Sequence, residues 1–62
     1  MIKVFITDDH ELYLEGLCLL LKKQEGIEVV GTSLSGKELL AKLPGTGAEV
    51  LLLDVNLPDI EE

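Results

Sequence analysis

The chain has 62 residues, of which 12 are acidic and five are lysines, and it contains no arginine. Its formal net charge of −7 argues against direct binding to nucleic acids or anionic membranes, because both require a basic face. The charge instead favours divalent cations or a basic partner. Hydrophobic residues make up 47% of the chain, with one Phe and one Tyr, so mainly aliphatic side chains form the core of one small domain.

The chain has a single cysteine, Cys18. It has no partner for a disulfide within the chain and cannot build a zinc ribbon. A lone thiol is typical of a reducing compartment. The sequence shows neither a signal segment nor an apolar run of membrane-spanning length. We therefore expect a cytoplasmic protein.

The first predicted elements are a strand and a helix. The short, mostly apolar run Ile2–Thr7 predicts a buried strand, and residues 8–10 form the polar turn after it. From Glu11 onward the apolar residues recur at helical spacing. They form a stripe that is expected to face a sheet, made up of Leu14, Leu17, Cys18 and Leu21. Gly26 follows the lysines of the last turn and marks the end of this helix.

The second half repeats the alternation. A second strand is predicted from Ile27 to Val30, with a possible extension to Ser33. The segment Ser35–Glu38 has the spacing of a capping box and opens a second helix. Its predicted apolar face consists of Leu39, Leu40 and Leu43. Pro44 and Gly45 end this helix, and Val50–Leu53 forms a third strand.

The order of these elements, β-α-β-α-β, predicts an α/β fold with a parallel sheet and crossover helices. Crossovers of this kind are nearly always right-handed. In the strand order 2-1-3 the helices lie on opposite faces and the first and third strands are neighbours. The order 1-2-3 separates those two strands, and the pattern alone leaves both orders open.

Three carboxylates stand at the ends of the predicted strands. Asp8 and Asp9 follow the first strand, and Asp54 follows the third. In the order 2-1-3 they meet in one crevice, where open α/β sheets bind their ligands. Such a cluster repels itself and therefore takes up protons or binds a cation, and oxygen ligands suit Mg²⁺. A carboxylate there is also a potential nucleophile toward phosphorus.

Each of these residues also has a purely structural interpretation. The Asp8–Asp9 pair by itself is more typical of a solvated helix cap, and a lone Asp54 after a strand is often a turn residue. The combination of all three favours a functional site. His10 next to the pair is interpreted as an exposed turn residue, with a metal ligand or a phosphohistidine as the alternative.

The spaced set of motifs resembles the N-terminal half of a receiver domain from bacterial two-component response regulators. The residues that carry the resemblance are Asp8-Asp9 after the first strand and Leu51-Leu-Leu-Asp54-Val-Asn-Leu-Pro58 at the third. The segment from His10 to Leu17 is similar to the class in which a helix-turn-helix DNA-binding domain follows the receiver. The resemblance implies a flavodoxin-like doubly wound sheet, here truncated to three strands in the order 2-1-3.

The resemblance also implies roles for individual residues. Asp54 would be the phosphoacceptor for a histidine kinase. Mg²⁺ would be held by Asp8, Asp9, Asp54 and the backbone carbonyl of Asn56. The family further requires a Ser or Thr after a fourth strand and a Lys after a fifth, which these residues do not include. We therefore expect residues 1–62 to be the N-terminal part of a receiver, which is a phosphoacceptor and not an enzyme, with DNA contacted only through a C-terminal domain.

Two other functions stay open at this point. The segment from Asp54 to Asn56 resembles the haloacid-dehalogenase phosphatase motif, although that motif requires Asp where Asn56 stands. Alternatively the chain is a self-associating module without chemistry. In the order 2-1-3 the strand Val50–Leu53 forms an edge without proline or lysine. We therefore expect it to pair with a second copy of the chain.

Overall fold

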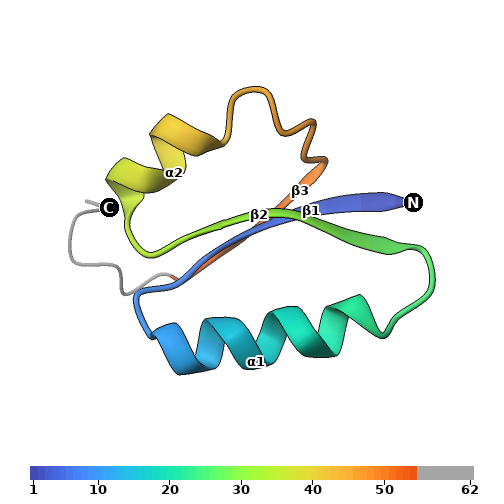
Figure 1. The fold of residues 1–62 in the computed structure, drawn as a ribbon. Coiled ribbons are helices and arrows are strands. Elements are labelled where there is room, and N and C mark those ends of the chain that lie inside the picture. Colours follow the sequence, from blue (N-terminus) through green and yellow to red (C-terminus); the bar gives the residue numbers. More distant parts are fainter. Residues whose placement is uncertain (55–62) are drawn as a thin grey trace.

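The computed structural model describes residues 1–54, and all five predicted elements are present in this range. They follow one another in the order expected from the sequence (Figure 1). The strands are β1 (Ile2–Thr7), β2 (Ile27–Ser33) and β3 (Val50–Leu53), and the helices are α1 (Glu11–Lys22) and α2 (Gly36–Lys42). Within these residues, no helix has the length and apolar character needed to cross a membrane.

The three strands form one parallel sheet in the order β2-β1-β3. Of the two orders that the sequence left open, this is the one that makes β1 and β3 neighbours. The helices α1 and α2 lie on opposite faces of the sheet (Figure 1), as right-handed crossovers on the two sides of β1 require. The predicted α/β fold is confirmed, and the carboxyl ends of β1 and β3 lie side by side.

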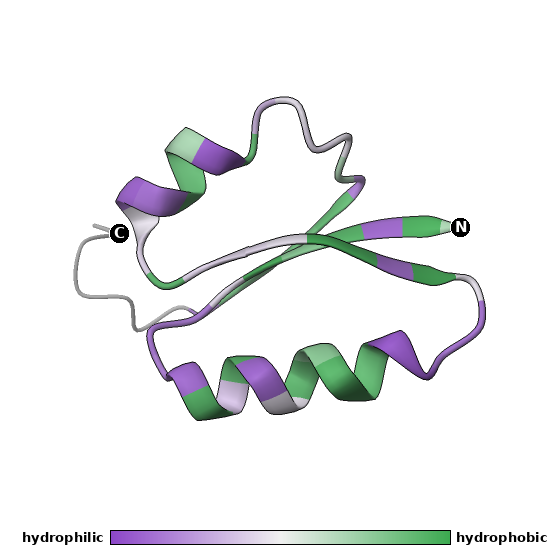
Figure 2. Cartoon of the chain, in the orientation of Figure 1, coloured by the Kyte–Doolittle hydropathy of each residue, from purple (hydrophilic) through white to green (hydrophobic). Residues whose placement is uncertain are grey.

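The main core lies between the sheet and α1. Val4 and Ile6 of β1 pack with Leu14 of α1, and all three are buried. Partly buried residues complete this cluster: Leu17, Cys18, Leu21, Ile27 and Val29. The predicted apolar stripe of α1 is thus confirmed, and Figure 2 shows hydrophobic residues in the strands and in α1, interrupted by hydrophilic ones.

The apolar face predicted for α2 is only partly correct. Leu39 is buried and Leu43 is half-buried, but the side chain of Leu40 is 76% exposed. Successive residues of a helix differ in direction by about 100°, and in α2 it is Leu39 rather than Leu40 whose side chain is buried. Two adjacent leucines in α2, Leu39 and Leu40, therefore differ in burial.

The start of α2 confirms the Ser35 half of the predicted capping box. Ser35 has an extended backbone, and its Oγ accepts a hydrogen bond from the backbone N–H of Glu38 at 3.1 Å. The Glu38 carboxylate lies 3.3 Å from Lys42 Nζ one turn further along the helix. The side chain of Ser35 thus satisfies one of the backbone donors that the first turn of a helix leaves unpaired.

The end of α1 differs from the prediction. The helix stops at Lys22, and Lys23 is its C-terminal cap residue. Gly26 lies further along, in the turn before β2, with φ of +84°. It therefore supplies the left-handed conformation that this turn requires rather than the end of the helix itself.

An irregularity in β2 creates a close contact with β1. Val4 is paired with Val29, but Phe5 is paired with Gly31, so Val30 is an extra residue in the ladder. The Phe5 side chain is fully buried. A Cβ atom at Gly31 would lie 2.6 Å from Phe5 Cε2 and 2.8 Å from Cδ2. The aromatic ring therefore occupies the space that any other residue at position 31 would need.

The third strand is less buried than the sequence suggested. Its four residues are 38–42% exposed, although a run of this kind is typical of a strand covered on both faces. The reason is that, among residues 1–54, β3 pairs with β1 alone and forms an edge of the sheet. Among the described residues, the prediction that this strand is an edge is confirmed.

Candidate functional site

Backbone hydrogen bonds extend the sheet to the residues that carry the carboxylates. The N–H of Asp8 donates to the carbonyl of Ser33 at 3.2 Å, and the N–H of Asp54 donates to the carbonyl of Thr7 at 3.0 Å. The ladders on both sides of β1 thus continue one residue beyond their strands. This places the chain segments of Asp8 and Asp54 at the same edge of the sheet, as predicted.

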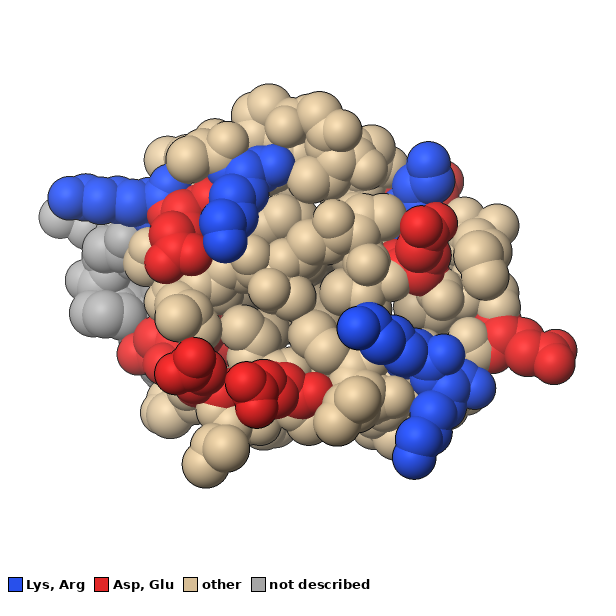
Figure 3. Space-filling model, in the orientation of Figure 1, with Lys and Arg blue, Asp and Glu red and all other residues tan. Residues whose placement is uncertain are grey.

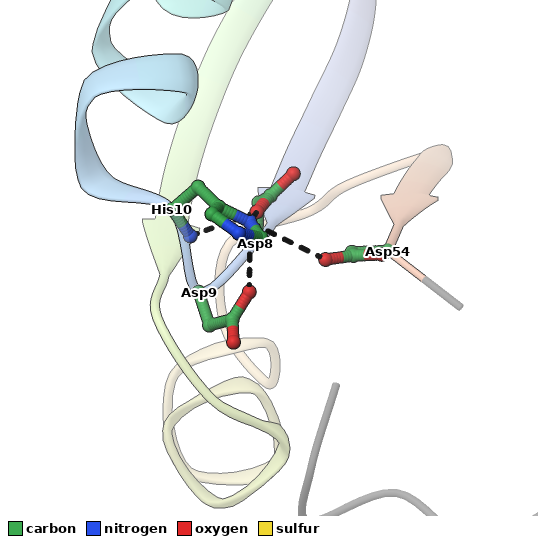
Figure 4. Close-up of side chains that lie close together, drawn as sticks. All are labelled: Asp8, Asp9, His10 and Asp54. Atoms are coloured by element: carbon green, nitrogen blue, oxygen red, sulfur yellow. Dashed lines mark hydrogen bonds and ion pairs between the residues drawn. The ribbon is translucent and has the colours of Figure 1, made fainter. Parts of the chain in front are cut away.

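Four side chains converge at this edge, as Figure 4 shows. Asp8, Asp9, His10 and Asp54 each offer one potential ligand atom, and these atoms lie within 4.8 Å of one another. The carboxyl groups differ in exposure: 11% for the side chain of Asp8, 15% for Asp54 and 36% for Asp9. The site is therefore a partly desolvated cluster that opens to solvent on the side of Asp9 and His10.

His10 takes a larger part in this cluster than the sequence suggested. Its side chain is 74% exposed, as expected of a turn residue, but its ring faces the carboxylates. His10 Nδ1 lies 3.1 Å from Asp8 Oδ1, 3.0 Å from Asp9 Oδ1 and 4.0 Å from Asp54 Oδ2. The only sequence signal for this contact was its position directly after two aspartates.

A local hydrogen bond explains why the ring is held there. Asp8 Oδ1 accepts the backbone N–H of His10 at 2.8 Å, the turn that an Asp commonly forms with the residue two positions later. His10 is also the N-cap residue of α1, but its own side chain forms no capping bond. The turn folds the backbone of His10 back toward Asp8 and so directs the imidazole over the acidic group.

The two partners of this turn change each other's ionisation. The backbone N–H of His10 is the main cause that lowers the pKa of the Asp8 carboxyl, and the His10 side chain acts in the same direction against desolvation. The hydrogen bond that the His10 ring donates to the Asp8 carboxylate is the main cause that raises the pKa of His10, followed by the charges of Asp9 and Asp8. Asp8 is thus held as a carboxylate, with an imidazole as its closest basic group.

The donor set fits a divalent cation. Carboxylates at the ends of two adjacent strands meet here, and none of the four clustered side chains is a lysine or arginine. A bound cation would therefore compensate their negative charge. Three carboxylate oxygens are the ligand type that Mg²⁺ prefers, with waters completing its octahedron. Two other residues of the predicted site, Asn56 and Pro58, lie outside the described residues.

An open hollow of about 810 Å³ adjoins the cluster. Asp8, His10 and Asp54 stand at its polar side. Its other walls come from β1, α1 and β3 and are mainly apolar, with Ile6, Tyr13, Leu17, Leu52 and Leu53. The clustered groups are therefore accessible to a small ligand from the side of the sheet that α1 covers.

The lysines form small, separate groups on the surface. On the face drawn in Figure 3 they form separate groups over α2, at the C-terminal end of α1 and at the upper right of the view, with acidic side chains between them. Lys22 belongs to the last turn of α1, whereas Glu11 lies in its first turn. Both positions complement the helix dipole. Glu11 and Lys22 thus each stabilise the end of α1 at which they lie.

The sequence of the chain matches a known protein family. The model of the response regulator receiver domain matches residues 4–61. The DNA-binding transcriptional activator DevR/DosR of Mycobacterium tuberculosis is 44% identical over 59 residues, which is 95% of this chain and 27% of that protein. The transcriptional regulatory protein UhpA of Escherichia coli is 42% identical over 60 residues, which is 97% of this chain and 31% of that protein.

A third relative is named as an enzyme and is similar to this chain over nearly the same residues. The protein-glutamate methylesterase/protein-glutamine glutaminase of Clostridium acetobutylicum is 39% identical over 57 residues, 92% of this chain and 16% of that protein. No solved structure gives a significant match. The chain spans less than a third of the length of these relatives. Because the family model covers nearly the whole chain, the chain belongs to the response regulator receiver domain family.

Proposed function

We propose that this chain is the phosphoacceptor part of a two-component system, acting in the cytoplasm. Asp54 accepts a phosphoryl group from a histidine kinase, with Mg²⁺ bound beside it. The observation that carries the proposal is the convergence of Asp54, from β3, with Asp8 and Asp9, from the end of β1, within 4.8 Å. Membership of the receiver family supports the same assignment.

The chemistry is a transfer between two nucleophiles. A carboxylate oxygen of Asp54 attacks the phosphorus atom of a phosphohistidine, and a P–O bond forms. The P–N bond breaks, and its electron pair stays on the imidazole nitrogen of the kinase, which takes up a proton. The product is an acyl phosphate on Asp54. Little covalent chemistry is required of the receiver, so position and charge decide the rate.

Asp54 is the best placed acceptor of the three carboxylates. Asp8 Oδ1 already accepts the backbone N–H of His10, which suits a fixed ligand better than a group that must form a new bond. Asp9 is the most exposed of the three. Asp54 faces the hollow between β1, α1 and β3, where a phosphodonor can approach it.

The metal site follows from the same residues. We propose that Asp8, Asp9 and Asp54 hold Mg²⁺, together with the backbone carbonyl of Asn56, which the resemblance adds. When bound, Mg²⁺ neutralises charge on the phosphoryl oxygens. The protein groups orient the acceptor carboxylate. They also hold the carboxylate oxygens so close together that these oxygens repel one another, and a bound cation relieves that repulsion.

The phosphorylated state is proposed to act through parts of a longer protein. Two of the relatives are named as transcriptional regulators, one of them as DNA-binding. We propose by analogy that residues 1–62 are the N-terminal part of a receiver and that a C-terminal domain contacts DNA. An acyl phosphate that persists as a signal also agrees with a switch rather than with an enzyme that turns over substrate.

Acetyl phosphate with Mg²⁺ is expected to add one phosphoryl group to the chain, at Asp54. Asp54→Asn should abolish the addition, because an amide is a poor nucleophile. Asp9→Asn should weaken Mg²⁺ binding and slow the reaction. Glu11→Gln, the same loss of one charge outside the cluster, should change neither. Intact-mass measurements with a parallel Mg²⁺ titration test this expectation.

Three outcomes would contradict the assignment. Modification that persists in Asp54→Asn would place the acceptor elsewhere. Equal Mg²⁺ affinity of Asp9→Asn and the parent chain would argue against the metal site. Repeated hydrolysis of phosphate esters would favour the phosphatase function that the sequence left open.

We further propose that a chain of these 62 residues pairs with a second copy through β3. The edge of β3 has four residues that are 38–42% exposed and no proline or lysine, so it lacks the usual protection against pairing. Leu52→Lys should shift the chain toward monomer. Leu40→Lys, the same change at an exposed position of α2, should not. Sedimentation that shows a folded parent monomer at micromolar concentration would contradict the proposal.

A further inference from the structure

We propose that His10 is a nitrogen ligand that shifts the metal preference of this site from Mg²⁺ toward Co²⁺, Ni²⁺ and Zn²⁺. The inference rests on the metal site of the proposed function and adds one residue to it. It concerns which ion the site takes, and its test separates that question from whether the site binds an ion at all.

The distances from the imidazole match those between ligands of one metal ion. With metal–ligand bonds of about 2.1 Å, neighbouring ligands of an octahedron are about 3.0 Å apart and opposite ones about 4.2 Å. His10 Nδ1 forms a hydrogen bond with Asp8 Oδ1 at 3.1 Å and an ion pair with Asp9 Oδ1 at 3.0 Å, and these separations are also those of neighbouring ligands of one ion. Its distance of 4.0 Å from Asp54 Oδ2 is close to that of opposite ligands.

The backbone keeps the ring in this position. The N–H of His10 donates to Asp8 Oδ1 at 2.8 Å, and α1 begins at the next residue. The ring is therefore carried by a turn and a helix start rather than by a long loop. Because the side chain remains 74% exposed, a small adjustment of the ring suffices to direct its Nδ1 lone pair at an ion and leaves the core undisturbed.

The chemistry of the ligand set determines the preference. Carboxylates and water suit Mg²⁺, whereas an imidazole nitrogen suits the later first-row metals. A site of three carboxylates alone would bind these ions in the order of affinity that divalent metals show for most ligands. One nitrogen ligand strengthens binding of Co²⁺, Ni²⁺ and Zn²⁺ and adds little for Mg²⁺, which completes its shell with water. The ratio of the two affinities therefore reports on His10.

The test compares Co²⁺ and Mg²⁺ affinities of the parent, His10→Ala and His10→Asn at one fixed pH. Both variants should lose at least about tenfold in Co²⁺ affinity, since loss of even an outer-shell partner of a metal costs that much. Their Mg²⁺ affinity should change by less than about twofold. His10→Asn keeps a polar side chain at this position, so it separates loss of the nitrogen from loss of bulk.

A second readout needs no variant. His10 is the only histidine of the chain, so its imidazole ¹⁵N signals are assigned without ambiguity. At a pH at which the imidazole is neutral with and without metal, addition of Zn²⁺ should shift the Nδ1 signal strongly, and addition of Mg²⁺ should shift it much less. Cys18, the other late-metal ligand of the chain, is half-buried and packs against the core beneath α1. Cys18→Ala should therefore leave Co²⁺ affinity unchanged.

Failure of this inference and failure of the metal site have different signatures. Equal Co²⁺ and Mg²⁺ losses in His10→Ala, or an unchanged Co²⁺ affinity beside intact Mg²⁺ binding, would overturn the role of His10 alone. Absence of Mg²⁺ and Co²⁺ binding in the folded parent chain would overturn both proposals. A Co²⁺ affinity that depends on Cys18 would place the nitrogen-preferring site elsewhere and would also overturn the inference.

Discussion

Gly31→Ala should destabilise the chain strongly, by about 2–3 kcal/mol. Overall stability at this chain length is of the order of 3–9 kcal/mol, so a large part of the folding free energy should be lost. The cause is the Phe5 ring, two atoms of which would lie 2.6 and 2.8 Å from the new Cβ. Urea unfolding followed by circular dichroism measures the loss.

The Phe5 ring has little space into which it could move. Phe5 is fully buried in the central strand of the described sheet, and interiors of this kind are closely packed. The extra residue, Val30, brings Gly31 opposite Phe5 in the ladder. Relief of the clash would therefore require a shift of β1 against β2, and with it a loss of their hydrogen-bond register.

Gly16→Ala is the matched control for this prediction. A Cβ at Gly16 would meet no atom within 4 Å, and Ala is preferred over Gly within a helix by about 1 kcal/mol. A Gly→Ala change should therefore stabilise the chain at position 16, in α1, and destabilise it at position 31, in the sheet. Combining Gly31→Ala with Phe5→Leu should cost less than the sum of the two single changes, because the smaller side chain leaves space. Strict additivity would contradict the proposed clash.

The features that sequence reasoning predicted correctly are those with local causes. Apolar runs ended by polar residues define β1 and β3, and the helical spacing of Leu14 and Leu17 defines the buried face of α1. The Ser35 cap depends on a residue three positions away. Even the convergence of Asp8 with Asp54 followed once the strand order was chosen, because both stand at the carboxyl ends of neighbouring parallel strands.

The features that it missed depend on contacts that no local pattern contains. The place of Gly31 against Phe5 requires the register of β1 and β2, although a glycine inside a strand is a known sign of a bulge or a close approach. The ring of His10 lies among the carboxylates because of the direction of one turn. The exposure of Leu40 follows from how α2 is rotated on the sheet, which its composition does not specify.

The second large effect is expected at a pair of hydroxyl groups beneath the acidic cluster. Thr7 Oγ1 and Ser33 Oγ lie 2.7 Å apart, and both residues are 1% exposed. They are partners in the ladder between β1 and β2, and Asp8 follows directly after Thr7. The hydrogen bond therefore joins the two strands at the edge of the sheet that carries the site.

Thr7→Val keeps the shape of the side chain but leaves the Ser33 hydroxyl buried without this partner. A buried polar group that loses its hydrogen bond costs about 1–3 kcal/mol. Ser33→Ala should cost a similar amount, because it strands the hydroxyl of Thr7 in the same way. The double variant should recover most of the loss, since replacement of both partners by apolar groups is nearly neutral.

The comparison of all four chains by urea unfolding distinguishes this pair from ordinary packing. If the two hydroxyls matter mainly to each other, the double variant is more stable than either single variant. If the costs of the single changes simply add, the residues act by filling space. Thr7→Ser, which retains the hydroxyl and removes a methyl group, provides the complementary control. It should cost only the burial of that methyl group, about 1 kcal/mol, and should preserve the coupling to Ser33.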